Sequence, residues 1–192
     1  MTHASSRVSA LRSVALNVPD LVAAEHFYTT IWHLQVVARG EGAIYFRGTG
    51  ADHHLLALHQ AEGPAKIRCV TLRARDRSAL DAVASAALVA GGKVMQPVAQ
   101  VTEPGGGTGV TVVDPDGRVF QLVHGDALHA DAHEAADQPI RLAHAVLNSH
   151  DVESTRRFME SVLDFSLSDR TRIMAFMRCN SDHHSIALGD TD

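Results

Sequence analysis

The sequence predicts an α+β protein built from repeated βαβββ units. Shifting the chain by 131 residues places the segment that begins at Leu142 on the segment that begins at Leu11. Both copies later contain Asp-His-His, at residues 52–54 and 182–184. Short apolar stretches also alternate with residues that cap helices. Self-similarity at so long a spacing indicates duplicated supersecondary modules rather than a short-period solenoid.

The first unit is predicted over residues 10–60. Leu11–Val18 is short and rich in Val, Leu and Ala, which is typical of a strand. Asp20 stands where the N-cap of a helix belongs, and apolar residues follow it at helical spacing. Phe27 and Tyr28 belong to that stripe, so we expect them in the core, as we do Phe158 in the third unit. Three strands should follow, near 34–40, 43–47 and 53–60.

The second unit is predicted over residues 66–124. It opens with the strand KIRCVTLRA, and Asp76 then caps a helix that ends at Gly91-Gly92. The segments KVMQPVAQ, GVTVVD and RVFQLV are three further strands. The last two are joined by Pro115-Asp116-Gly117, a tight-turn tripeptide. Residues 1–124 therefore read as an N-terminal domain of two units.

A linker and a third unit follow. Residues 125–140 are polar, acidic and without periodicity, so we expect a solvated linker that includes His129 and His133. The third unit should open with a strand at Arg141–Ser149 and a helix capped by Asp151. Its later strands are expected near 165–170, 172–178 and 183–188. Residues 141–192 would then be the first part of a C-terminal domain.

Composition excludes several classes of protein. With 45% apolar residues the chain can bury one large core or two modest ones. A formal net charge of -5 argues against nucleic-acid binding, which needs a basic surface. No apolar run is long enough to span a membrane. The two cysteines, Cys69 and Cys179, are far apart in the sequence, which suits a reducing cytoplasm, where we expect the protein.

Several motifs together resemble the vicinal-oxygen-chelate superfamily, which contains glyoxalase I, bleomycin-resistance proteins and extradiol dioxygenases. They are the paired βαβββ units, the Asp-Pro-Asp-Gly turn at 114–117, and the Leu-x-His-x-x-Leu strand that begins at Leu142. The stretch Cys-Asn-Ser-Asp-His-His at 179–184 resembles the type I extradiol branch, the dihydroxybiphenyl and catechol 2,3-dioxygenases. There, two units form an N-terminal domain and two more form the catalytic domain.

This resemblance implies a non-haem Fe(II) held by two histidines and a glutamate, with Mn(II) as the alternative metal. His144 matches the first metal ligand, and His184 matches the histidine that handles protons. The second histidine ligand and the glutamate belong to a fourth unit, expected beyond Asp192, so we expect the chain to be incomplete and inactive alone. Two non-catalytic alternatives remain open. His144 could be a core histidine that is hydrogen-bonded to the backbone, and His184 could have a structural role only, because the first copy keeps His54 at the matching position.

The N-terminal half is expected to hold no metal. The positions that match the ligands of the family carry Ser13, Cys69 and Gln121, which do not form a facial iron site. Strand alternation places His144 on the cupped face with Val146 and Asn148, opposite the helix-packing face.

The expected function is therefore an extradiol ring-cleaving dioxygenase that inserts O2 into a catecholic small molecule in the breakdown of aromatic compounds. We expect a homo-oligomer with no nucleic-acid or membrane partner. Two alternatives remain open: a glyoxalase-like lyase or isomerase with a different divalent metal, and a metal-free ligand-binding protein of the bleomycin-resistance type.

Overall fold

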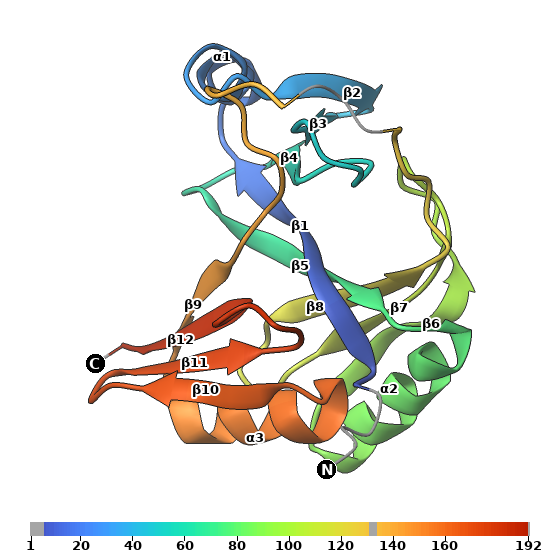
Figure 1. Cartoon of the computed structure of the whole chain (residues 1–192), viewed down its shortest axis with the longest axis vertical. Helices are drawn as coiled ribbons and strands as arrows, with labels where there is room; N and C mark the ends of the chain where they lie inside the picture. Colours follow the sequence, from blue (N-terminus) through green and yellow to red (C-terminus); the bar gives the residue numbers. More distant parts are fainter. Residues whose placement is uncertain (1–5, 131–133, 192) are drawn as a thin grey trace.

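Three βαβββ units succeed one another in the computed structural model, which describes residues 6–130 and 134–191 (Figure 1). The first unit contains β1 (Val8–Val18), α1 (Leu21–Thr30), β2 (Gln35–Gly40), β3 (Ala43–Arg47) and β4 (Leu56–Gln60). The second contains β5 (Lys66–Ala74), α2 (Arg77–Val89), β6 (Lys93–Gln100), β7 (Thr108–Val113) and β8 (Val119–His124). The third contains β9 (Ala145–Ser149), α3 (Val152–Leu163), β10 (Ser166–Arg170), β11 (Met174–Arg178) and β12 (Ile186–Asp190). The predicted fold class is confirmed.

The strand order shows the duplication directly. The third unit forms a four-stranded sheet in the order β10-β11-β12-β9, which repeats the order β2-β3-β4-β1 of the first unit. The first two units share one eight-stranded sheet, because β1 pairs in parallel with β4 on one side and antiparallel with β5 on the other. β9 pairs in parallel with β12 as β1 does with β4, and within the described residues its other edge has no partner.

The three helices begin where the sequence predicts. The side chains of Asp20, Asp76 and Asp151 each accept a hydrogen bond from the backbone N–H three residues later, at 2.9 Å in all three cases. Each cap satisfies one of the N–H groups that a helix leaves without a partner at its start.

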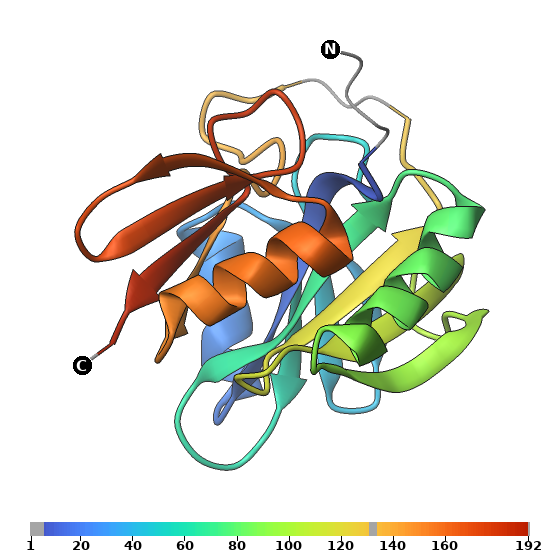
Figure 2. The same cartoon turned by 90° about the horizontal axis from the view of Figure 1, so that it is seen from below.

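The third unit is fixed to the second by a shared core. Helices α2 and α3 lie side by side (Figure 2), and one cluster of buried residues includes Leu80 and Val83 of α2 with Phe158 and Met159 of α3. The approach is close at Gly92, where a Cβ atom would lie 2.7 Å from Cε2 of Phe158. The prediction that Phe158 is a core residue is confirmed.

The prediction for Phe27 is wrong, because 45% of this side chain is exposed. Leu21, Ala24 and Tyr28 pack against the core cluster of the first unit. Phe27 lies one position before Tyr28, and one residue turns an α-helix by about 100°. Its ring therefore points away from the sheet and meets Tyr28 edge-on at 5.2 Å between centroids.

Three predicted strand starts are also wrong, and the first is that of β4, which begins at Leu56 rather than at 53. β9 begins at Ala145 rather than at 141, so His144 directly precedes the strand. β12 begins at Ile186, so His183 and His184 lie in the loop before it, where alternation along a strand does not decide their direction. A turn occupies this loop instead: the backbone N–H of Asp182 donates to Oδ1 of Asn180 at 2.9 Å.

The segment predicted to be a solvated linker, 125–140, packs against the first unit at both ends. Asp126 is buried, and Leu128 forms a β-bridge with Asp52. Near the other end, the backbone N–H groups of Thr49 and Gly50 donate to the carbonyls of Pro139 and Ile140, at 3.0 Å each. Most of the described residues between these ends are exposed, as composition indicates, but Asp126 and the carbonyls of Pro139 and Ile140 have partners within the protein.

Two histidines of this segment were expected to be solvated. The ring of His129 stacks on that of His53 at 5.4 Å between centroids, and His133 lies outside the described residues. Within the described residues, no helix is long and apolar enough to cross a membrane.

Candidate active site

His144 and His184 come together although they lie 40 positions apart in the sequence. The centroids of their rings are 4.8 Å apart. The parallel pairing of β9 and β12 causes this proximity, because Ala145 lies opposite Ile186 and its N–H donates to the carbonyl of Ser185 at 3.0 Å. Each histidine therefore lies shortly before its strand, at the end of the sheet where β9 and β12 begin.

His144 directly precedes β9, so its contacts, and not the alternation along the strand, place it on one face of the sheet. Ala145, Leu147 and Ser149 are buried on the side of α3, whereas Val146 and Asn148 are exposed on the other side. The ring of His144 lies against that of His184, which contacts Phe176 of β11. Ala175 and Met177, which alternate with Phe176, are buried on the side of α3, so Phe176 and both histidines lie on the face that α3 does not cover. This is the arrangement that the sequence predicts for the cupped face.

The surroundings of His184 complete the local geometry. The ring of Phe176, from β11, meets His184 edge-on with centroids 5.0 Å apart. Nδ1 of His183 lies 2.9 Å from Nδ1 of His184, but the side chain of His183 is 60% exposed and approaches Asp169. Burial, followed by the charges of His144 and His183, lowers the pKa of His184 from its ordinary value. His184 is thus half-buried between the ring of Phe176 and the imidazoles of His144 and His183.

A metal would find one suitable ligand position here but not a complete set. The imidazole of His144 is an appropriate donor for Fe(II) or Mn(II), and its exposure leaves it free to bind. Residues 6–130 and 134–191 contain no group of three or more His, Cys, Asp or Glu side chains that could hold a metal ion. Within the described residues His144 could therefore supply one ligand, and a metal site would need further donors.

The matching place in the first unit is occupied by an arginine. Nη1 of Arg12, a buried side chain, donates to Oγ of Ser13 at 3.0 Å and lies 2.7 Å from Nε2 of His54. Nε of Arg12 donates to Oδ2 of Asp126 at 3.1 Å. Burial, followed by the charge of Arg12, lowers the pKa of His54 to about 2. A guanidinium thus stands beside the residues that match His144 and His184.

The other two ligand-equivalent positions are also unsuited to a metal. Burial, followed by the charge of Glu103, raises the pKa of the Cys69 thiol to about 12, which makes it a poorer metal ligand because metals bind the thiolate. Gln121 is a neutral amide on β8. These properties support the prediction that the N-terminal half binds no metal.

Sequence reasoning missed Arg12 and Asp126. A signal was present for the first: Arg12 interrupts the apolar strand LRSVAL, and a charged residue in such a strand needs a buried partner. Nothing local marked Asp126, which lies 114 positions from Arg12.

The chain belongs to the Glyoxalase/Bleomycin resistance protein/Dioxygenase superfamily, whose sequence model matches residues 10–122 and 141–192. It is 30% identical over 100 residues to an iron-dependent extradiol dioxygenase of Rhodococcus jostii (strain RHA1), a match that covers 41% of this chain and 33% of that protein.

Two solved structures give the same picture. The Mn(II)-bound glyoxalase from Novosphingobium aromaticivorans has a TM-score of 0.92 and 34% identity, over 97% of this chain and 63% of that one. Homoprotocatechuate 2,3-dioxygenase from Brevibacterium fuscum, in complex with 3,4-dihydroxyphenylacetate, has a TM-score of 0.85 and 21% identity. The second match shows the fold alone; it covers all of this chain and 63% of that one. The chain thus spans about a third of the curated relative and less than two thirds of these structures, and the relatives are metalloenzymes.

Proposed function

We propose that this chain carries part of the active site of an extradiol ring-cleaving dioxygenase that acts on a catecholic compound. The observation that carries the proposal is the pairing of His144 with His184 on the face that α3 leaves open. In the first copy the matching residues, Ser13 and His54, both contact the guanidinium of Arg12. The third unit has an imidazole at each of these two positions.

In this proposal His144 is a metal ligand. The metal, Fe(II) or alternatively Mn(II), would supply one ion on which the two catechol oxygens and O2 meet. His184 is close to His144 yet partly enclosed by Phe176, so it would hold or release a proton at a catechol oxygen. The ring of Phe176 would pack against the flat substrate and help to exclude water from it.

The remaining ligands are proposed to come from a further βαβββ unit that pairs with the open edge of β9. In the first two units, β5 pairs antiparallel with the matching edge of β1. The exposed edge of β9, with Val146 half exposed beside it, offers the same backbone donors and acceptors to a further strand. A histidine and a glutamate on that unit would complete the facial set.

A glyoxalase-like lyase or isomerase is the second candidate. It is favoured by the likeness to the Mn(II)-bound glyoxalase, which at 34% identity exceeds the 21% shared with the dioxygenase from Brevibacterium fuscum. The two candidates share the metal ligand and differ in whether O2 is consumed, so the reaction itself separates them.

The test uses the whole protein that carries this chain, loaded anaerobically with Fe(II) and then given a catechol and air. His144→Ala should lose the metal, whereas His184→Ala should keep it and lose about 10²–10⁴ in turnover, as removal of a proton-transfer group typically does. His150→Ala is the matched control, because His150 is exposed at the far end of β9 and should change neither quantity.

Three measurements decide the outcome: metal per subunit, O2 uptake, and the absorbance of a ring-cleaved product. Equal metal loss in both variants would contradict the separate roles of the two histidines. A protein that binds metal stoichiometrically but consumes no O2 with any catechol would favour the lyase or isomerase.

A further inference from the structure

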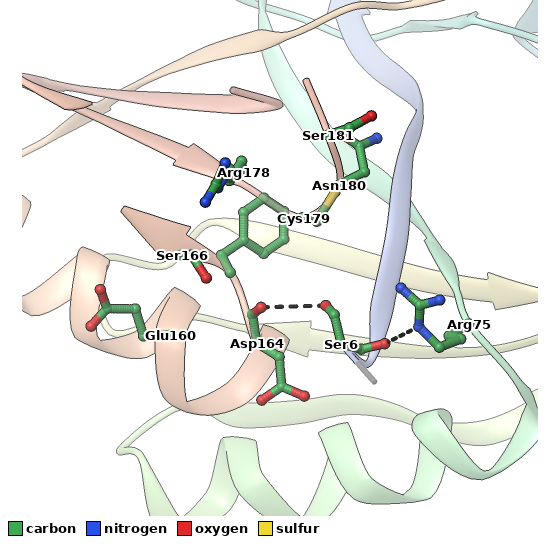
Figure 3. A pocket seen from close by; sticks show the side chains of 10 residues that line it. Ser6, Arg75, Glu160, Asp164, Ser166, Arg178, Cys179, Asn180 and Ser181 are labelled. Carbon is green, nitrogen blue, oxygen red and sulfur yellow. Dashed lines mark hydrogen bonds between the residues drawn. The ribbon is translucent and has the colours of Figure 1, made fainter. Parts of the chain in front are cut away.

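A cavity lies at the junction between the first two units and the third, away from the histidine pair. Its volume is about 790 Å³. Figure 3 shows it bounded by Ser6, two residues before β1, by Arg75, directly after β5, by the end of α3, and by the end of β11 with the loop that follows. Residues from all three units therefore meet around one space, although nothing in the expected chemistry of His144 and His184 uses it.

The acidic side chains of this cavity are already neutralised by arginines outside its lining. Oε1 of Glu160 accepts a hydrogen bond from Nη1 of Arg156 at 2.6 Å. Oδ2 of Asp164 accepts from the backbone N–H of Arg7 at 3.1 Å and lies 3.4 Å from its Nε. Each carboxylate therefore already has an arginine beside it.

The two basic side chains that line the cavity, Arg75 and Arg178, have no acidic partner among the described residues. The side chain of Arg75 donates one hydrogen bond, from Nε to the carbonyl of Ser6 at 2.6 Å. Its two terminal nitrogens have no partner among the described residues. The backbone of Arg178 pairs with Ser166 of β10, but its side chain makes no hydrogen bond or ion pair with any residue in the described ranges 6–130 and 134–191. Each guanidinium thus presents the flat pair of N–H donors that binds a carboxylate or a phosphate.

The remaining lining suits an anion with polar ends. Ser166 and Ser181 offer hydroxyl donors, and the lining contains the buried residues Phe165 and Cys179. The two arginines come from different units, Arg75 from the strand end of the second and Arg178 from β11 of the third. A space this large accommodates more than a single phosphate, which is a much smaller group.

We propose that this cleft binds a small anion with two charged ends, one held by Arg75 and the other by Arg178. Such an anion bridges the second and third units and stabilises their junction, because it binds the folded arrangement and not the unfolded chain. This cleft shares no residue with the proposed active site, so the proposal of anion binding does not depend on ring cleavage.

The test is isothermal titration calorimetry at constant ionic strength, with pyrophosphate and succinate as two-ended probes and with inorganic phosphate and acetate as one-ended probes. Constant ionic strength is needed because salt screens exposed charges. Pyrophosphate or succinate should bind saturably and more tightly than its one-ended counterpart; which of the two binds better identifies a phosphate or a carboxylate ligand.

Three variants assign the binding to the cleft. Arg178→Gln and Arg75→Gln should each weaken the two-ended probe by about tenfold or more, as loss of a hydrogen bond to a charged group does. Arg172→Gln is the control: this exposed arginine lies in the turn between β10 and β11, at the other end of the hairpin, and its loss should change the affinity by less than about twofold.

The variants should also unfold at the temperature of the parent protein when no anion is present, since both arginines are exposed. Absence of saturable binding by the parent protein would overturn the proposal. Equal affinity in Arg178→Gln and the parent, or an equal loss in Arg172→Gln, would overturn it as well.

Discussion

Replacing Asp126 by Asn removes the carboxylate that is hydrogen-bonded to the buried guanidinium of Arg12. The side chain of Asp126 is fully buried, and that of Arg12 is 5% exposed. Oδ2 of Asp126 accepts from Nε of Arg12 at 3.1 Å, and Oδ1 accepts from Nη1 of Arg73 at 2.5 Å. In the variant Arg73 keeps its pairing with Asp52 at 2.6 Å, but Arg12 keeps only neutral partners.

The expected loss in the free energy of unfolding arises because the guanidinium of Arg12 stays buried without the carboxylate that it contacts. Breaking a buried ion pair by removing one partner typically costs about 3–5 kcal/mol in the free energy of unfolding. The matched control is Asp81→Asn, because Asp81 pairs with Arg77 at 3.0 Å while its side chain is 69% exposed. An exposed pair of this kind is worth about 1 kcal/mol or less.

Equilibrium unfolding in urea measures both changes. With a slope of about 2 kcal/mol per molar urea, the midpoint of Asp126→Asn should fall by about 1.5–2.5 M. The midpoint of Asp81→Asn should fall by about 0.5 M or less on the same slope. If the two variants lost the same small amount, the charge of Arg12 would be compensated without Asp126, and the segment 125–140 would not be held by this ion pair.

Three further outcomes are expected. Phe158→Ala should cost about 3–5 kcal/mol in the same urea assay because the ring is 2% exposed, whereas Leu88→Ala, at a residue 64% exposed, should cost about 0.5 kcal/mol or less. Burial and the charge of Arg12 lower the pKa of His54 to about 2, whereas an unfolded histidine has a pKa of 6.5. Between these values only the unfolded chain takes up a proton at His54, so the stability contributed by the neutral His54 is complete above pH 6.5 and falls below it. Below pH 6.5 the parent should lose about 1.4 kcal/mol per pH unit relative to His54→Gln, and parallel pH profiles of the two would contradict this. Finally, crystals soaked in Fe(II) or Mn(II) should show no ion on Ser13, Cys69 and Gln121; an ion bonded to any two of them would overturn the metal-free interpretation of the N-terminal half.

The sequence by itself determined the modules and their order. Helix starts depend on short-range contacts, such as that between Asp151 and the N–H of Ser154, and these are visible in the local pattern. The repeat then assigned matching strands to the first and third units. For the same reason the sequence could select His144 and His184: each is defined by its place in a repeated unit and by its resemblance to a family.

Only the tertiary structure decided which side chains are buried and which of them meet. The distance between His144 and His184 follows from the pairing of β9 with β12, a contact between segments 41 residues apart at Ala145 and Ile186. Phe27 has the local pattern of a core residue and is exposed, because burial depends on which segment covers it. Asp126 has the local pattern of a linker residue and is buried, because two arginines far away in the sequence, one of them itself buried, require its charge.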